Sequence, residues 1–239
     1  MLKLIRADFY RMFHRVYVYG MLAGLLALSV LINVVLRGSE DYAAVSFSWE
    51  LLLNYLVFPL MLLPMLADVV FGEEWKEHTL KNTVAGGVNR VELYVSKLIS
   101  SVLLGAVLAA VTLGVYCAAS LLLLQRDAQF TDVFVRLFFE RFGVACILYA
   151  AGTALAVLSI SAFGKSSLSV FVFYGLVFLL KYLFALLRVP QLNKYLLVSQ
   201  FSALCGSAQD LRAASVVGAV SFAVFAVLGP VLFRKRNIE

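Results

Sequence analysis

Long apolar stretches alternate with short polar segments along the whole chain. Each apolar stretch has about 20 residues or more, the length that an α-helix needs to cross a hydrocarbon layer of ~30 Å. Inside lipid the backbone must satisfy its own hydrogen bonds, and the sequence lacks the ten-residue alternating pattern of a membrane barrel. The pattern predicts an all-α integral membrane protein in which residues 1–239 form a single transmembrane domain. The spans are expected at 16–36, 50–71, 98–124, 142–163, 168–187 and 213–233.

Composition agrees with lipid as the main solvent of this chain. The sequence is 63% hydrophobic and 14% charged, whereas soluble domains carry about 25% charged residues. Lys and Arg number 12 in the N-terminal segment, the segments after spans two and four and the tail, against 7 in the opposite loops. By the positive-inside rule, both termini are expected in the cytoplasm. The net charge of +6 then reflects topology and attraction to anionic lipid, and no nucleic-acid partner is expected.

The first 15 residues predict a separate helix. Apolar side chains recur there at spacings of three and four, while the basic residues lie largely elsewhere. The apolar positions are Leu2, Ile5, Phe9, Met12 and Phe13. We expect residues 1–15 to form an interfacial amphipathic helix that lies along the lipid headgroups and leads into span one.

Three features modify the picture of simple straight spans. Pro59 and Pro64 each remove a backbone donor within span two, so this helix is expected to bend. An apolar stripe between Phe130 and Phe138 predicts a second interfacial helix before span four. Segment 188–212 is too apolar for a free loop and too broken for a span, so we expect this outer, re-entrant segment to dip partway into the outer leaflet.

The segment 72–97, between spans two and three, combines charge with apolar residues. Glu73, Glu74 and Glu77 come first, where acids complement the dipole of a short helix over 73–84. Gly86 and Gly87 end that helix, because adjacent glycines allow a positive φ at little steric cost. We interpret the helix as a docking element for a cytoplasmic partner; the alternative is a merely solvated loop.

A well-marked helix start follows the glycine turn. Asn89 is the candidate N-cap, and Glu92 stands three residues later, as in a capping box. A helix that begins at Arg90 is expected to continue to Leu124, about 52 Å at 1.5 Å per residue. Span three should therefore project well beyond the membrane on the cytoplasmic side.

Candidate catalytic and metal-binding chemistry is sparse. The fragment "FGKSS" at 163–167 resembles the end of a phosphate-binding loop, but Ser159 stands where that motif needs glycine. His14 and His78 are the only histidines and no HExxH motif is present, whereas zinc catalysis needs about three protein ligands. Cys117, Cys146 and Cys205 have no metal-ligand spacing. We therefore predict neither catalytic residues nor a metal site, and the chain is not expected to be an enzyme.

The charged segment carries a resemblance to a known family. An acidic residue after span two, a Thr-Leu pair, a turn with Arg and a Lys before span three are similar to the signature of ABC-2 permeases of bacterial ABC transporters. The matching residues are Glu73, Glu74, Thr79, Leu80, Asn89, Arg90, Ser96 and Lys97. The sequence departs from the family pattern at His78, where Gly usually precedes the Thr-Leu pair, and at "AGGVNR", where the turn often bears proline.

The resemblance implies a function and partners. It implies a permease subunit in the bacterial cytoplasmic membrane whose segment 73–84 is a coupling helix seated in a separate ATPase subunit, where ATP and Mg²⁺ bind. It also implies a second permease copy or a related permease, and export along the path between the two. The contact residues would be Glu73, Glu74, Trp75, Glu77, Thr79, Leu80 and Arg90, with Gly86 and Gly87 setting the angle of the turn.

The cargo and two rival classes stay open at this point. Apolar, aromatic-rich spans suit a hydrophobic or amphipathic cargo, such as an antimicrobial peptide or a drug, but they suit lipid equally well. The rivals are an intramembrane enzyme, for instance a protease, and a nucleotide-independent carrier or scaffold. A requirement for a partner ATPase separates the exporter from both.

Overall fold

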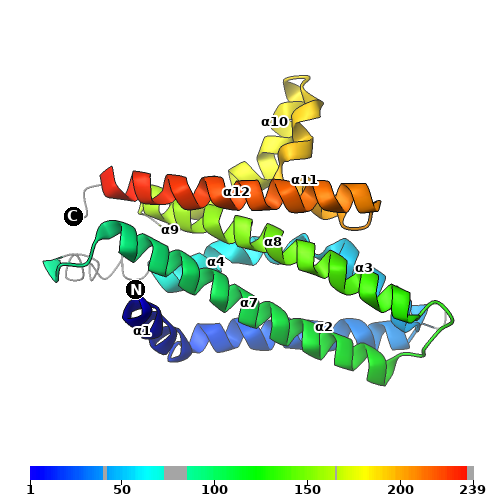
Figure 1. The fold of residues 1–239 in the computed structure, drawn as a ribbon. Helices are drawn as coiled ribbons and strands as arrows, with labels where there is room; N and C mark the ends of the chain where they lie inside the picture. The colour runs from blue at the N-terminus through cyan, green and yellow to red at the C-terminus, as the bar shows by residue number, and fades with distance from the viewer. Residues whose placement is uncertain (40–41, 73–84, 165, 236–239) are drawn as a thin grey trace.

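The computed structural model describes residues 1–39, 42–72, 85–164 and 166–235. Four long helices lie side by side along one axis, in the order α2, α7, α8 and α12 across the bundle (Figure 1). Their bounds are α2 Val16–Arg37, α7 Arg90–Leu123, α8 Asp132–Phe163 and α12 Ala208–Lys235. The remaining elements are α1 Leu2–Phe13, α3 Val45–Tyr55, η2 Phe58–Leu62, α4 Leu63–Ala67, η3 Asp68–Gly72, α9 Ser166–Tyr174, η4 Gly175–Leu179, α10 Leu180–Leu186, η5 Pro190–Tyr195 and α11 Leu197–Ala203.

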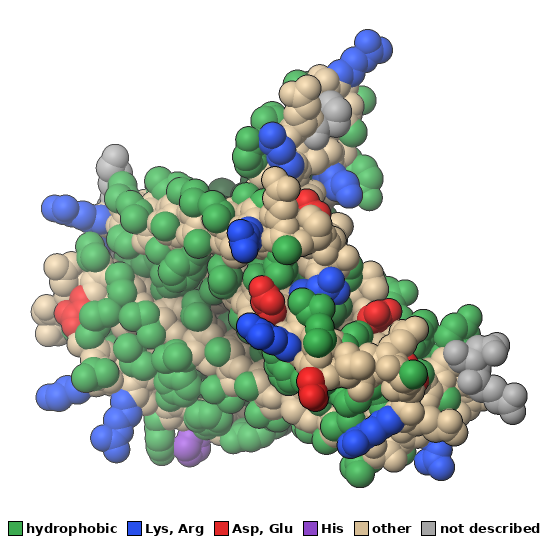
Figure 2. Space-filling model, turned by 45° about the vertical axis from the view of Figure 1, so that its right-hand side comes forward, with side chains coloured by type: hydrophobic (Ala, Val, Ile, Leu, Met, Phe, Trp, Pro, Cys, Tyr) green, Lys and Arg blue, Asp and Glu red, His purple; other side chains and the backbone are tan. Residues whose placement is uncertain are grey.

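The helices have the length and the surface of membrane spans. Among the described residues, five helices are long and apolar enough to cross a membrane, and α3 with Phe58–Gly72 forms a sixth if this bent pair counts as one span. Helix α8 is central. In its apolar 18-residue stretch 61% of the residues are buried, against 17–28% in the corresponding stretches of the other four helices. Hydrophobic side chains cover the flank of the bundle, while charged side chains gather at its ends and on one projecting segment (Figure 2).

Helix α1 lies at the end of the bundle where α7 starts and α12 ends, which we call the α1 end (Figure 1). The predicted helix over 1–15 is present as α1, and Met12 from its apolar stripe is buried. Leu2, at the other end of the stripe, is 84% exposed. The placement of α1 among lipid headgroups stays a prediction.

The second span is bent, as its prolines predicted. Helix α3 and the stretch Phe58–Gly72 meet at an angle of 44°. Pro59 lies in the first turn of η2 and Pro64 in the first turn of α4, where a missing N–H is tolerated. Each proline thus begins a new helical piece, and the span becomes a chain of short elements.

Two tyrosine hydroxyls satisfy carbonyl groups in this broken stretch. Tyr149 of α8 donates a hydrogen bond to the carbonyl of Leu56, whose usual partner, the N–H of Leu60, binds Val57 O instead. Tyr174 of α9 donates to Met61 O at 2.7 Å. Because lipid offers no replacement donors, these side chains hold the bend in place.

The helix that leads into span two begins at Val45, five residues before the expected start of the span at residue 50. The loop after α7 fixes this start: Gln125 N–H donates to Ala43 O at 2.9 Å and Val45 N–H to Gln125 O at 3.0 Å. Asp127 accepts from the hydroxyl of Ser46 at 2.5 Å. Slight burial raises the pKa of Asp127. Hydrogen bonds from the Ser46 side chain and from the backbone of Asp127, Ser46 and Gln129 more than offset this, so the pKa lies below its ordinary value.

The interfacial helix expected before span four does not exist as a separate element. Helix α8 runs without a break from Asp132, capped by Thr131, whose hydroxyl accepts from Phe134 N–H at 3.3 Å. The aromatic stripe turns toward Trp49 of α3, with ring centroids 4.4 Å apart for Phe138. The sequence expectation was wrong here because the stripe packs on another helix.

The fifth span keeps its predicted length but not a straight path. Its helical piece Ser167–Leu186 is long and apolar enough to cross a membrane. A π-helical turn, η4, interrupts this piece at Gly175–Leu179. Beyond that turn α10 projects away from the bundle (Figure 1), and none of its described side chains is buried. Segment 188–212 then returns through η5 and α11, and α11 packs on α12 and α8. Its depth in the outer leaflet stays a prediction.

A buried polar network joins three spans. Ser48 Oγ of α3 lies 2.9 Å from Asn33 Oδ1 of α2 and 2.9 Å from Tyr116 Oη of α7, and Tyr116 donates to Ser48 O at 2.8 Å. All three residues are buried. Hydrogen bonds of this kind hold helices together in lipid, where the hydrophobic effect does not act between them.

We expect Tyr149→Phe to destabilise the protein, because it leaves the Leu56 carbonyl without a donor, a loss worth about 1–3 kcal/mol. The measurement is the melting temperature of the purified protein in one detergent. Tyr182→Phe, on a side chain that is 71% exposed, is the matched control. An unchanged melting temperature for Tyr149→Phe would show that the hydroxyl does not hold the bend.

Candidate functional site

Most residues predicted to contact an ATPase lie outside the described residues. These are Glu73, Glu74, Trp75, Glu77, Thr79 and Leu80, all within 73–84. Arg90, Gly86 and Gly87 are described, and so are both ends of the chain that flank 73–84. The site is therefore described through its two anchors, which are the end of the second span before residue 73 and the start of α7 after residue 84.

The first anchor is the end of the second span. Phe71 is fully buried, and Gly72 is buried beside Asp68 within η3. A Cβ added to Gly72 would lie 1.8 Å from Asp68 Oδ1. A larger residue at this position would therefore have to displace the Asp68 carboxylate.

The second anchor is the start of α7, and it follows the sequence prediction closely. Gly86 and Gly87 form a turn, and Gly87 has a φ of 88°, which a residue with a side chain rarely adopts. The side chain of Asn89 accepts a hydrogen bond from Val91 N–H at 3.0 Å, so Asn89 is the N-cap. The Glu92 carboxylate, expected to complete a capping box, pairs with the amino group of Met1.

An aromatic cluster joins the two anchors to the last span. Tyr94 of α7, Phe71 of η3 and Phe233 of α12 are fully buried, and their ring centroids lie 5.6–6.5 Å apart. Arg90 donates to the carbonyl of Arg234 at 3.3 Å. Both ends of the segment thus rest on one packed unit that includes the end of α12.

The contact between α7 and α12 depends on Gly229. A Cβ at this position would lie 2.0 Å from both Cζ and Oη of Tyr94. The Tyr94 hydroxyl is buried and has no hydrogen-bond partner among the described residues. Gly229 therefore sets how closely the last span approaches the base of α7.

A buried ion pair attaches α1 to α7. Lys97 Nζ lies 2.5 Å from Asp8 Oδ1, and the two side chains are 3% and 5% exposed. Ser100 donates from its hydroxyl to Asp8 Oδ2 at 3.1 Å. Removing one partner of such a pair strands a charge away from water, which costs about 3–5 kcal/mol.

Lys97 was expected in the cytoplasmic segment before span three, and Asp8 was not among the predicted site residues. A signal was present, since Asp8 is the only acid among the first 15 residues and shares the face of Ile5 and Met12 by helical spacing. An acid on the apolar face of a basic helix indicates a buried cation nearby. Identifying Lys97 as that cation required the packing of α1 on α7.

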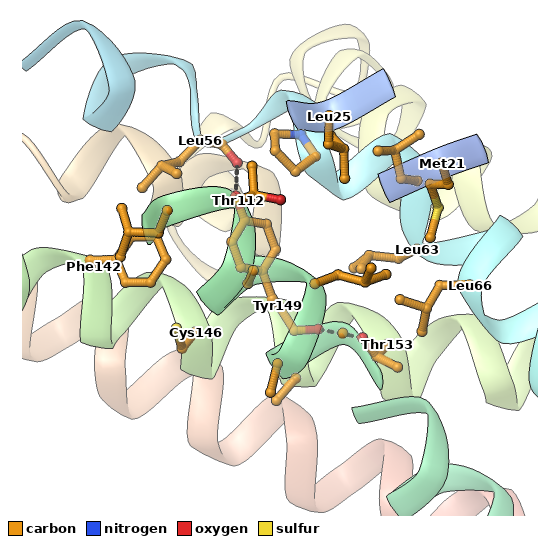
Figure 3. A pocket seen from close by; sticks show the side chains of 18 of the residues that line it. Met21, Leu25, Leu56, Leu63, Leu66, Thr112, Phe142, Cys146, Tyr149 and Thr153 are labelled. Atoms are coloured by element: carbon orange, nitrogen blue, oxygen red, sulfur yellow. Dashed lines mark hydrogen bonds between the residues drawn. The ribbon is translucent and has the colours of Figure 1, made fainter. Parts of the chain in front are cut away.

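A second feature is a cavity of about 180 Å³ inside the bundle. Its walls come from α2, the bent second span, α7 and α8 (Figure 3). The lining is mainly apolar and includes Met21, Leu25, Leu56, Pro59, Leu63, Leu66, Ala109, Phe142 and Cys146. The bend at Pro59 thus forms part of the cavity wall.

The hydroxyl groups that line the cavity are mostly engaged with the backbone. Tyr149 donates to Leu56 O, and Thr153 donates to Tyr149 O at 2.8 Å (Figure 3). Ser29 donates to Leu25 O at 2.8 Å. Thr112 Oγ1 is buried and has no hydrogen-bond partner among the described residues. The cavity therefore presents hydrocarbon with one available hydroxyl.

The volume of the cavity allows an estimate of the free energy that leaving it empty would cost. At ~24 cal/mol per Å³, leaving 180 Å³ empty would cost about 4 kcal/mol. That is a large share of the 5–15 kcal/mol typical of folded proteins. An occupant that fills the space with hydrocarbon would remove this cost.

Metal-ligating side chains do not cluster in the part of the chain that the structure describes, where no group of three His, Cys, Asp or Glu could hold an ion. His14 Nδ1 lies 2.7 Å from Tyr10 O, and His78 lies outside the described residues. The three cysteines are free thiols.

The long apolar helices, the bent span and the anchored segment define a multi-pass α-helical membrane protein. The model of the family described as "ABC-2 family transporter protein" matches residues 4–185. Since the match covers about three quarters of the chain, the protein belongs to this family and is a membrane permease of an ABC transporter. No curated protein matches the chain at a significant level. Permeases of this family work with an ABC ATPase subunit and generally have no catalytic site of their own.

We expect Asp8→Leu and Lys97→Met each to lower the free energy of unfolding by about 3–5 kcal/mol, because each strands a buried charge. The double variant should lose less than the sum, since it strands none. Thermal unfolding of the four proteins in one detergent measures this cycle, with Lys3→Met on the exposed face of α1 as the control. Additive losses would contradict a direct pair.

We expect Gly229→Ala to destabilise the α1 end, because the new methyl group cannot fit against the Tyr94 ring. Gly114→Ala, with nothing within 4 Å of the added Cβ, should be neutral or slightly stabilising, since alanine favours helix by about 1 kcal/mol over glycine. Proteolysis of the folded protein between spans two and three reports the local effect. Equal cleavage rates in both variants would contradict the close contact.

Proposed function

We propose that the chain is the membrane-spanning subunit of a bacterial ABC exporter. It would act with a separately encoded ATPase subunit, which binds ATP and Mg²⁺, and with a second permease copy or a related permease. Family membership supports the permease assignment. The coupling proposal rests on the packed aromatic cluster of Phe71, Tyr94 and Phe233, which joins the parts of the chain on either side of segment 73–84.

This arrangement suits the transfer of mechanical work. A push on segment 73–84 would reach the second span through Phe71, the third through Tyr94 and the sixth through Phe233. Helix α7 is a single rod of 34 residues, about 51 Å at 1.5 Å per residue, so movement at its base would reach the opposite end of the bundle. The bend at Pro59 is the natural place for the second span to change its angle.

The proposed coupling to an ATPase also implies an orientation of the permease in the membrane. The α1 end would face the cytoplasm of the bacterial inner membrane, with both termini and the coupling segment on that side, as the distribution of Lys and Arg indicates. The path for a hydrophobic or amphipathic cargo would lie between the two permeases. A membrane enzyme, or a carrier or scaffold without nucleotide, would need no ATPase.

We expect the double variant Glu73→Lys, Glu74→Lys to lose its ATPase partner. Reversing two charges at a docking surface costs several kcal/mol, so recovery of the ATPase on the tagged permease should fall at least about ten-fold. The experiment is co-purification of the permease with its candidate ATPase from the same membranes, followed by ATP hydrolysis by the complex.

Glu140→Lys is the control, because Glu140 is an exposed acid on α8, outside the segment. This variant should retain wild-type recovery and hydrolysis. Unaltered assembly and hydrolysis in the double variant would refute the docking role of 73–84. Turnover by the purified chain without nucleotide would favour the rival classes.

A further inference from the structure

The cavity is elongated along the bundle. Its lining runs on α2 from Met21 to Ser29 and on α7 from Val102 to Tyr116, which at 1.5 Å per residue corresponds to about 12 Å and 21 Å. Half of a hydrocarbon core is ~15 Å thick. The long dimension of the cavity therefore follows the direction of lipid tails and has the depth of about one leaflet.

The chemistry of the walls selects an apolar occupant. Four of the lining hydroxyls, those of Ser29, Tyr116, Tyr149 and Thr153, donate to backbone carbonyls. The fifth, Thr112 Oγ1, has no partner among the described residues. A charged or strongly polar group would find no counterpart there. Apolar cavities of ~150 Å³ in soluble proteins stay dry and bind benzene, and 180 Å³ likewise gives room for a hydrocarbon segment.

The bilayer is the nearest source of such hydrocarbon. Helix α2 packs along α7, while α4 packs along α7 and α8, and the cavity lies between these walls. The outer face of α2 is apolar and exposed, for example at Leu28 and Leu31, which are 52% and 57% exposed. The cavity reaches the surface of the bundle, since its lining residues Ala106 and Cys146 are exposed. A lipid beside the bundle would therefore need to move only its tail to enter.

We propose that the cavity holds one acyl chain of a membrane lipid, bound within each permease as a structural ligand. Leu56, Pro59, Leu62, Leu63 and Leu66 of the broken span line the cavity. The acyl chain would therefore fill the space beside the bend and support a stretch of the second span that has lost regular helical packing. The proposal requires that the permease lies in a membrane, but it does not depend on export or on an ATPase.

The test uses the full-length permease in nanodiscs of phosphatidylethanolamine that contain a phospholipid with a photoactivatable diazirine midway along one acyl chain. After irradiation, peptide mass spectrometry locates the cross-links. The expected result is labelling within 102–116 and 142–153, on cavity-lining residues such as Thr112 and the buried Thr153. Labels confined to lipid-facing residues such as Leu28 and Leu31 would overturn the proposal.

Two neighbouring alanines provide a matched pair. Ala109 lines the cavity, whereas Ala110 is exposed and outside it. Ala109→Phe should reduce cavity labelling at least about five-fold, because a phenyl ring occupies the space of the chain. Ala110→Phe should leave it unchanged. Equal labelling in a folded Ala109→Phe protein would overturn the assignment.

A second cavity variant, Ala150→Phe, and a free fatty-acid probe extend the experiment. If Ala109→Phe does not fold, Ala150→Phe narrows the cavity from α8, and the wild-type map of cross-links still decides the question. A diazirine-labelled free fatty acid is tested in parallel. Labelling by the fatty acid but not by the phospholipid would assign the cavity to a free amphiphile and refute a bilayer lipid as the occupant.

Discussion

Polar groups inside the bundle can be satisfied only within the protein, because lipid supplies no partners. The carbonyls in the broken span are satisfied by Tyr149 and Tyr174. The carboxylate of Asp8 is satisfied by Lys97 and Ser100. These contacts are the fixed points of the structure, and each joins elements that are distant in sequence. The apolar packing of α2, α7, α8 and α12 is arranged around them.

At the α1 end, these fixed points combine into a platform. The Asp8–Lys97 pair holds α1 on α7, the rings of Phe71, Tyr94 and Phe233 hold three spans together, and Arg90 reaches the end of α12. Under the proposed coupling, a push on segment 73–84 would move this platform as a unit. This is the physical property that a permease driven by an external ATPase requires, since the chain belongs to a family in which the fuel is consumed by another subunit.

The middle of the bundle has the opposite character. There the second span is bent by 44°, its regular hydrogen bonds are interrupted, and a cavity lies against the bend. Close packing resists changes of shape, so the packed α1 end forms a rigid base, whereas the bent span beside the cavity is less tightly packed. If the cavity holds an acyl chain as proposed, that chain would affect how readily the bend changes its angle.

The sequence alone determined the all-α membrane class, the bend at Pro59 and Pro64, the turn at Gly86 and Gly87 and the cap at Asn89, because each follows from local backbone chemistry or from the length of apolar runs. Arg90 was identified as a site residue, but its described contact with Arg234 O was not foreseen, and the residues of 73–84 stay a prediction. Only the tertiary structure decided that the aromatic stripe of α8 faces Trp49, that α10 leaves the bundle and that Asp8 pairs with Lys97. Hydropathy measures how apolar a face is, and in a membrane protein the lipid-facing and helix-facing sides are equally apolar, so the direction of a face and the partner of a buried charge are set by packing.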